Sequence, residues 1–189
     1  MSKIAALLLA ALVAGCMSTT PRQAERYFIL APAAVAADAG RPASSVRIAP
    51  MSASSFYDTQ DIAYSASPGT RAYYHYNRWT ERPQLAIHAA LASRLGPGSP
   101  QNALLLRTHL DEIYHDAAAT PGAARIVLTA QLVDADSRTV VARRTFAASA
   151  PAASHDAAGA VQGFGRALTE LIGNLATWVD AEARVARLR

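Results

Sequence analysis

The sequence predicts a single α+β domain in which two long helices pack on a mostly antiparallel sheet. A chain of 189 residues has the length of one domain. Short aromatic and β-branched runs, separated by turn residues, precede a segment whose apolar residues have helical spacing, and this order of strands and then a helix occurs twice. Such an order is typical of a sheet that is covered by its helices.

The first half contains four predicted strands. Two of them flank Pro68 and Gly69, residue types that favour a turn, so this pair predicts a hairpin. The segment 31–44 contains two prolines and a glycine but almost no large apolar side chain, and we expect a loop there. The four strands are expected at residues 27–30, 45–49, 61–65 and 71–76.

The first helix is expected from about residue 81 to residue 95. Thr80 is its expected N-terminal cap, Glu81 complements the positive end of the helix, and Pro83 fits in the first turn. Gly96 and Pro97 end it. One face is apolar because three large residues recur every four positions: Ile87, Leu91 and Leu95.

The second half predicts a three-stranded antiparallel meander followed by a longer helix. The strands are expected at residues 104–111, 125–133 and 139–146, with turns at Pro121-Gly122 and at 134–138. Ser154 or His155 is the expected cap of the helix. Its apolar residues keep helical spacing over five turns: Val161, Phe164, Leu168, Leu171, Ile172, Leu175, Trp178 and Val179.

Composition excludes several classes of protein. The net charge of +4 falls to +3 if Lys3, the only lysine, is removed with a leader, and the arginines are scattered, so nucleic acid is not expected as a partner. The single cysteine excludes an internal disulfide framework and a cysteine zinc cage. No run of eighteen apolar residues predicts a membrane-spanning helix, and 44 alanines inflate the hydrophobic fraction of 51%.

The N-terminal segment has the pattern of a secretory signal. A positive start at Lys3 is followed by eleven apolar residues and the small Gly15. Residues 12–16 (LVAGC) resemble the lipobox of bacterial lipoproteins, in which the cysteine thiol receives diacylglycerol and the bond before it is cut. We therefore expect a signal peptide at 1–15 and a lipidated tether at 16–26, with Cys16 carrying diacylglycerol and an N-acyl chain such as palmitate.

Lipidation predicts a domain that is held at a membrane. One acyl chain anchors only reversibly, whereas two or three hold a protein stably. By resemblance to lipoprotein sorting signals, the absence of Asp after Cys16, where Met17 stands, favours the periplasmic face of the outer membrane over the inner membrane. The alternative is a secreted protein with an incidental cysteine.

Two groups of residues are candidate chemical sites. His109, Asp111 and His115 share parity along one predicted strand and could line up for a metal, but a solvated strand face that ends in a loop is the favoured interpretation. Asp134 and Asp136 lie in a predicted turn, where Asp is common without catalysis. The sequence contains neither a nucleophile elbow nor a phosphate or dinucleotide loop, so we expect no enzyme, no metal and no cofactor besides the lipid.

An aromatic stretch stands out between residues 56 and 79. Either these rings fill the two faces of the predicted hairpin, or one face is exposed to a partner protein or lipid, since Tyr, Trp and Arg supply binding energy at interfaces. The aromatic residues are Phe56, Tyr57, Tyr64, Tyr73, Tyr74, Tyr76 and Trp79. Arginines 184, 187 and 189 form a basic tail, expected at 181–189, which either frays in solvent or contacts anionic lipid.

These features together resemble the ABC-type transport auxiliary lipoprotein family, which includes the lipoprotein of the paraquat-inducible transport system. The resemblance covers residues 26–179 and rests on the lipobox, on 27–30 (YFIL), on 61–64 (DIAY) and on 176–179 (ATWV). Its sharpest segment is 76–83 (YNRWTERP), where Arg78, Trp79, Glu81 and Pro83 lead into the first helix.

The resemblance implies a non-enzymatic auxiliary component of a lipid transporter, formed by a domain at 27–180. The implied partners are a mammalian-cell-entry-domain protein that bridges the periplasm and the permease and ATPase of the transporter; ring-like homo-oligomers are also implied. Five residues are the candidate partner contacts: Tyr74, Tyr76, Arg78, Trp79 and Glu81. The alternative function is a lipoprotein that binds cell-wall or lipid material without a transporter.

Overall fold

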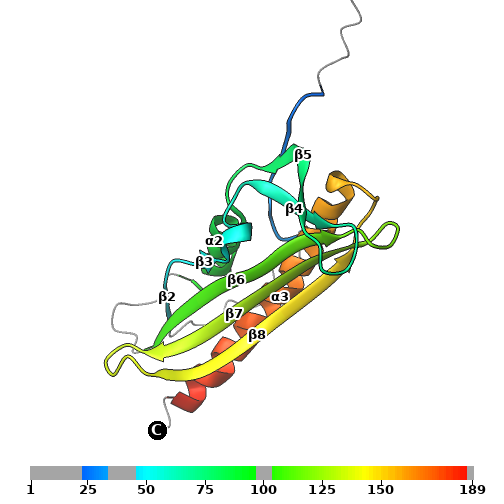
Figure 1. Cartoon of the computed structure of the whole chain (residues 1–189). Helices are drawn as coiled ribbons and strands as arrows, with labels where there is room; N and C mark the ends of the chain where they lie inside the picture. Colours follow the sequence, from blue (N-terminus) through cyan, green and yellow to red (C-terminus); the bar gives the residue numbers. More distant parts are fainter. Residues whose placement is uncertain (1–22, 34–45, 97–103, 187–189) are drawn as a thin grey trace, which may run out of the picture.

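The computed structural model describes residues 23–33, 46–96 and 104–186, which form one α+β domain (Figure 1). The predicted lipidation site and the leader, most of the expected loop at 31–44, Pro97, and Arg187 and Arg189 lie outside these ranges. The described strands are β1 (Arg26–Phe28), β2 (Val46–Ile48), β3 (Ser52–Ala53), β4 (Asp61–Ser65), β5 (Ala72–Trp79), β6 (Leu104–Asp116), β7 (Ala123–Asp134) and β8 (Val140–Pro151).

All eight strands belong to one sheet. Its main order is β1-β5-β4-β6-β7-β8, and β2 and β3 also pair with β6. The hairpin β4–β5 and the meander β6–β7–β8 are antiparallel, as predicted. The strands that pair with β6 on its other side (β2, β3 and β4) are parallel to it, and so is β1 to β5. The sheet is therefore mostly antiparallel with short parallel additions.

Two α-helices follow the strands, one in each half, so the predicted plan of strands and then a helix is confirmed. They are α2 (Pro83–Leu95) and α3 (Ala157–Ala186), and a 3-10 turn, η2 (Ser55–Tyr57), precedes β4. The long α3 runs diagonally behind the meander (Figure 1) and buries its apolar stripe against it. Within the described residues, no helix is both long enough and apolar enough to cross a membrane.

The strands of the meander are longer than predicted. The alternation of β7 fits a sheet with one covered face, since its even residues from 124 to 132 are buried. β6 continues to Asp116 and β8 to Pro151, because residues beyond the predicted ends still pair in register with β7, including the Ala-rich end of β8, which lacks strong strand propensity. Pairing across the sheet thus overrides weak local signals.

Both helices begin later than predicted. α2 starts at Pro83 with Arg82 in the capping position, so neither Thr80 nor Glu81 belongs to it. The cap of α3 is Asp156, whose carboxylate accepts the Gly159 N–H at 2.8 Å, in place of Ser154 or His155. That hydrogen bond lowers the pKa of Asp156. The end of α2 is as predicted, with Gly96 at a φ of 83°.

The segment expected as a basic tail continues the last helix. α3 extends to Ala186, and Ala183 within it is buried, so the first six residues of 181–189 are helical. Arg184 is exposed on this last turn of α3, where its charge complements the negative end of the helix.

Two glycines of α3 lead to opposite predictions for stability. A Cβ at Gly163 would lie 2.9 Å from the Ala124 Cβ and 3.0 Å from the Pro151 carbonyl oxygen, whereas one at Gly173 meets nothing within 4 Å. Gly173→Ala is expected to stabilise the fold by about 0.5–1 kcal/mol. Gly163→Ala is expected to cost about 1–3 kcal/mol through overpacking. Urea unfolding of both variants checks this, and a destabilising Gly173→Ala contradicts it.

Candidate partner-binding surface

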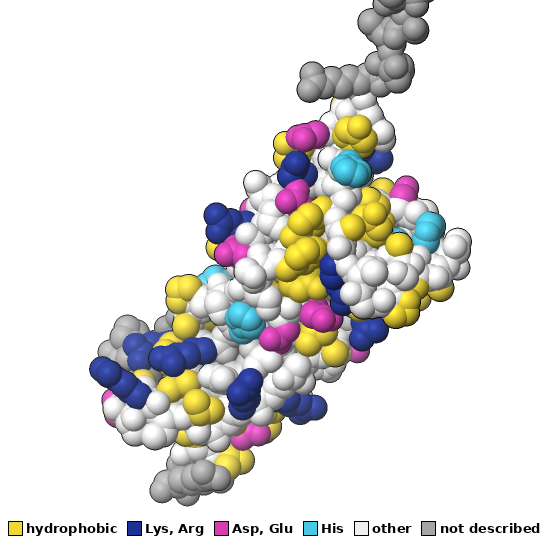
Figure 2. Space-filling model, in the orientation of Figure 1, with side chains coloured by type: hydrophobic (Ala, Val, Ile, Leu, Met, Phe, Trp, Pro, Cys, Tyr) yellow, Lys and Arg dark blue, Asp and Glu magenta, His cyan; other side chains and the backbone are white. Residues whose placement is uncertain are grey.

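The aromatic stretch lies on η2 and the β4–β5 hairpin. Between the pairs Asp61–Arg78 and Ala63–Tyr73, β4 has one intervening residue whereas β5 has four, residues 74–77. An irregularity of this kind redirects side chains. The rings therefore do not alternate evenly between two faces, as a regular hairpin would require. In Figure 2 hydrophobic side chains gather over this part of the sheet.

Part of the stretch holds the hairpin to η2. The Tyr73 ring stacks on Phe56 with centroids 4.5 Å apart, and the Tyr73 hydroxyl donates a hydrogen bond to the Phe56 carbonyl at 2.7 Å. Arg71 Nε donates to the Tyr57 hydroxyl at 3.0 Å, and the Arg71 guanidinium lies 3.6 Å from the centre of the Tyr114 ring. These rings consequently have a structural role.

Tyr74 takes part in a buried polar network with His115. The Tyr74 hydroxyl lies 2.7 Å from His115 Nδ1, and His115 Nε2 lies 3.0 Å from the Pro121 carbonyl oxygen. Because a carbonyl only accepts, Nε2 carries the ring proton in neutral His115, and Nδ1 accepts from Tyr74. Burial raises the pKa of Tyr74 to about 12 and lowers that of His115. This network joins β5, β6 and the loop before β7.

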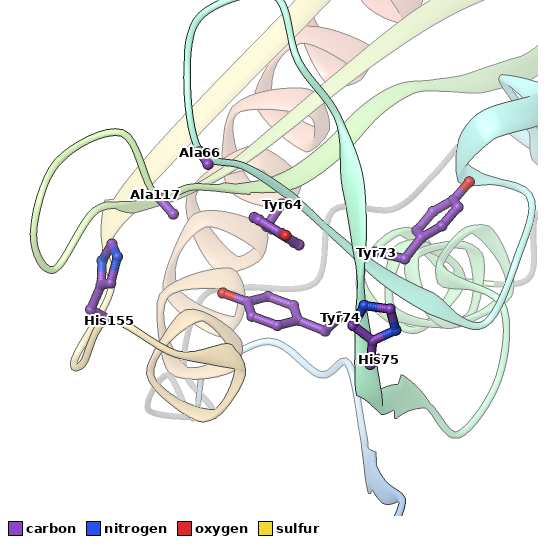
Figure 3. Close-up of a pocket in the computed structure, with 7 residues that line it drawn as sticks. All are labelled: Tyr64, Ala66, Tyr73, Tyr74, His75, Ala117 and His155. Atoms are coloured by element: carbon purple, nitrogen blue, oxygen red, sulfur yellow. The ribbon is translucent and has the colours of Figure 1, made fainter.

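The network borders a shallow pocket of about 250 Å³ (Figure 3). Tyr64 and Tyr74 face one another with ring centroids 4.7 Å apart, and the Tyr74 hydroxyl points toward the side of the pocket that carries His155 and Ala117. Tyr73 and His75 line the opposite side. Two of the side chains that line it, Tyr73 and Tyr74, donate their hydroxyl hydrogen bonds to the Phe56 carbonyl and to His115, and the second of these bonds holds the hairpin to the meander.

Lowering the pH is expected to destabilise the fold through His115. The side chain is fully buried and its pKa is lowered, whereas in the unfolded chain it binds a proton near pH 6.5. The contribution of neutral His115 to the free energy of unfolding is thus fully present above about pH 6.5. It is lost as the pH falls, by at most about 1.4 kcal/mol per pH unit. Urea unfolding at several pH values between 7.5 and 5.5 checks this. His115→Phe should flatten the slope, and His75→Ala, at an exposed position, should leave it unchanged.

The five candidate contact residues divide between core and surface. Trp79 is 1% exposed, and its ring meets Phe164 of α3 edge-to-face at 5.4 Å, so it belongs to the core. Tyr74 is half-buried in the network above, whereas Tyr76 is 43% exposed. Arg78 is half-buried, and Glu81, which lies between β5 and α2, is exposed. Contact with a partner stays a prediction for the four residues outside the core.

Exposed residues collect where β1 lies beside the end of β5. β1 pairs in parallel with β5, which sets Tyr27 opposite Arg78. Arg78 forms ion pairs with Asp61 and, at 3.4 Å, with Glu25. We call this surface the β1–β5 end and define it by five residues: Tyr27 (57% exposed), Ile29 (71%), Tyr76, Arg78 and Glu81. The exposure of Ile29 has no signal in the sequence, because this residue continues a strand-like run.

Of the three residues of the candidate metal site, His109 and Asp111 lie together, with Nε2 and Oδ1 4.0 Å apart, whereas His115 is on the other face. Asp111 is an extra residue in β6, because the pairing with β7 shifts between Leu110 and Glu112. This bulge reverses the alternation, so His115 is buried within β6 and is not in a loop, while His109 stays part-exposed. Within the described ranges, no group of three or more His, Cys, Asp or Glu could hold a metal ion.

Asp134 and Asp136 lie at the turn between β7 and β8. The Asp134 carboxylate accepts hydrogen bonds from the backbone N–H of Ser137 at 2.7 Å and of Asp136 at 3.2 Å. The Ser137 N–H and hydroxyl lower the pKa of Asp134. Asp134 therefore organises the turn, in agreement with the favoured interpretation.

The repeated strand-and-helix plan defines a single α+β domain, with exposed residues at the β1–β5 end. The chain belongs to the family of ABC-type transport auxiliary lipoprotein components, whose model matches residues 27–176. Family members are lipoproteins that accompany a transporter, which indicates a membrane-anchored envelope protein with an auxiliary role. Among curated proteins, none matches this chain.

Three solved structures are similar to this chain, and the first two share its fold. The protein XCC0632 from Xanthomonas campestris is 21% identical, with a TM-score of 0.77 over 87% of this chain and 99% of its own. An uncharacterized protein is 12% identical, with a TM-score of 0.64 over 83% of this chain and 99% of its own. A putative lipoprotein from Caulobacter crescentus is 17% identical over 74% of this chain and 91% of its own, with a TM-score of 0.45.

Proposed function

We propose that this chain is a non-enzymatic auxiliary lipoprotein of an ABC-type lipid transporter, anchored through acylated Cys16 to the periplasmic face of the outer membrane. Its partner is a mammalian-cell-entry-domain protein that connects it to the permease and ATPase of the inner membrane. Membership of the transport auxiliary lipoprotein family carries this proposal. The cargo on this proposal is a phospholipid or a related lipid.

The position of the β1–β5 end supports a role in docking. The described chain begins at residue 23, directly before β1, and the end of α3 lies at the opposite end of the molecule (Figure 1). The tether therefore joins the domain next to exposed Tyr27, Ile29 and Tyr76. Exposed aromatic residues flanked by charges are suited to protein contact.

Anchoring makes weak contacts sufficient. A lipid tether confines the domain to the membrane surface and so raises its effective concentration for a partner that reaches the same surface. A modest docking face can then hold a partner persistently. Ring-like self-association of the tethered domains, which belongs to the same proposal, would multiply these contacts further.

A charged substitution in the β1–β5 end tests the proposal. Tyr76→Asp, placed in the full chain in the native host, is expected to abolish co-purification of the entry-domain protein and to slow transfer of labelled phospholipid between the membranes. Val185→Asp is the matched control, because Val185 is 47% exposed near the far end of α3. Thermal unfolding of both variants verifies that the domain still folds.

Each outcome distinguishes the proposal from its alternative. Docking at the β1–β5 end is supported if Tyr76→Asp loses both co-purification of the partner and lipid transfer, while Val185→Asp keeps both. Normal lipid transfer after deletion of the whole gene contradicts the transport role. If such a deletion strain instead loses attachment of cell-wall material, the alternative of an independent envelope-binding lipoprotein holds.

A further inference from the structure

β8 forms one edge of the sheet and has an unpaired side. It is twelve residues long and is the last strand in the sheet order, with β7 on its only paired side among the described residues. The Ala152 N–H donates to the Gly122 carbonyl at 2.9 Å, at the end of the β7–β8 ladder. Opposite residue pairs in an antiparallel ladder are alternately hydrogen-bonded and non-hydrogen-bonded. Because Ala152 is bonded to Gly122, directly before β7, the backbone N–H and C=O groups of the even residues of β8 point toward β7. The backbone groups of four odd residues point outward: Arg143, Thr145, Ala147 and Ser149.

One end of this edge is closed. Pro151 has no N–H, and its carbonyl accepts a hydrogen bond from Arg166 of α3 at 2.5 Å. This bond agrees with the outward direction assigned to the odd residues. The open edge therefore runs from Arg143 to Ser149 and presents alternating donors and acceptors. Sheet edges of this kind bind extended chains unless they are covered.

A groove of about 670 Å³ runs beside the open edge, between β8 and the C-terminal half of α3. Phe146 and Trp178 line it and meet edge-to-face at 5.7 Å, with only 6% and 7% of their surfaces exposed. Ala147 and Ala181 leave room for a backbone to approach. In Figure 1 α3 continues past β8 at this end of the sheet.

The charges at the groove define its occupant further. Arg143 and Arg144 stand at the start of the open edge and, as consecutive strand residues, point to opposite faces of the sheet. Arg144 lines the groove, with its guanidinium 5.2 Å from the Phe146 ring centre. Glu182 lines the same groove, yet no ion pair of the described residues involves Arg143, Arg144 or Glu182. Two consecutive carboxylates on an incoming strand, one on each face of the sheet, would complement the two arginines.

We propose that β8 and the groove bind an extended segment of a partner protein, which adds a strand to the open edge and carries two consecutive acidic residues, one beside Arg143 and one beside Arg144 on the opposite face. Alternate side chains of that strand point into the groove toward Phe146 and Trp178, as the period of two in a strand requires. This site is separate from the β1–β5 end, so the proposal does not depend on the identity of the transporter.

Designed peptides test the proposal on the mature lipidated chain in detergent. The probes are a seven-residue peptide, Glu-Glu-Val-Thr-Val-Thr-Val, its counterpart with two lysines in place of the glutamates, and a form of the first peptide N-methylated at alternate residues. We expect the acidic peptide to bind about tenfold or more tightly than the basic one, and the N-methylated peptide not to bind.

Variants assign the binding to the groove. Ala147→Pro removes one outward N–H and leaves the pairing with β7 intact, so it should weaken binding about tenfold or more. Ala181→Arg places a long side chain in the groove at an exposed position of α3 and should block binding. This variant keeps the test decisive if Ala147→Pro does not fold. Arg144→Glu should remove the preference for the acidic peptide. Arg125→Glu is the matched control, because Arg125 is an exposed arginine of β7 that does not line the groove. It should leave the affinity for each peptide unchanged.

Three outcomes would overturn the proposal. The first is no binding of the acidic peptide at about 1 mM. The second is binding that neither Ala147→Pro nor Ala181→Arg weakens. The third is that the chain alone forms an oligomer in sedimentation experiments and that either variant converts this oligomer to a monomer. That result would mean that the groove binds a second copy of the chain.

Discussion

Replacing Trp79 by alanine is expected to destabilise the domain by about 3–5 kcal/mol. The side chain is 1% exposed and packs edge-to-face on Phe164, so it joins the end of β5 to α3. Truncation leaves a cavity between the hairpin and the long helix. Urea unfolding followed by circular dichroism measures the loss, and transport by this variant should fail because the domain unfolds.

Two further variants separate the core role of Trp79 from a role at the surface. Trp79→Phe retains an aromatic ring beside Phe164 and should recover most of the stability. Tyr76→Ala, at a side chain that is 43% exposed, should change the free energy of unfolding by less than about 0.5 kcal/mol. Wild-type stability in Trp79→Ala would contradict the packing described here and return this ring to the list of partner contacts.

Replacing Cys16 by serine is expected to release the protein from the membrane fraction. Serine offers no thiol for diacylglycerol, so the acyl chains that supply the anchoring free energy are absent and the leader is not cut at this site. Fractionation of cells, with intact-mass spectrometry of the purified chain, measures both effects. Ala24→Ser, in the segment expected as the tether, is the control and should stay in the membrane fraction. Membrane attachment of Cys16→Ser would support the alternative of an incidental cysteine.

The sequence predicted the elements whose signals are strong and periodic. The alternation in β6 up to Leu110, the turn at Pro68-Gly69 and the apolar stripe of α3 all have their expected places. The position of Trp79 did not follow from its neighbours, because a tyrosine-rich strand has the same pattern whether a given ring is buried or exposed. Its burial depends on α3, which lies far away in the sequence.

Irregularities in strand pairing explain most of the side-chain positions that the sequence did not predict. Neither the bulge at Asp111 nor the four intervening residues of β5 has a local signature, and both change which side chains share a face. The sequence therefore suggests His115 as a candidate ligand beside His109, whereas it is a buried partner of Tyr74. The groove beside β8 joins residues from β8 and α3, so it appears only when the two elements are packed together.

Isolation of the intact lipoprotein in mild detergent, from cells in which the transport system is active, is the most direct test of the proposed role. Proteins that remain bound after washing are identified by mass spectrometry, and a strain lacking the bait gives the background. The account predicts recovery of the entry-domain protein, with the permease and ATPase of the same transporter. Recovery of the lipoprotein alone, or with cell-wall proteins only, would contradict it.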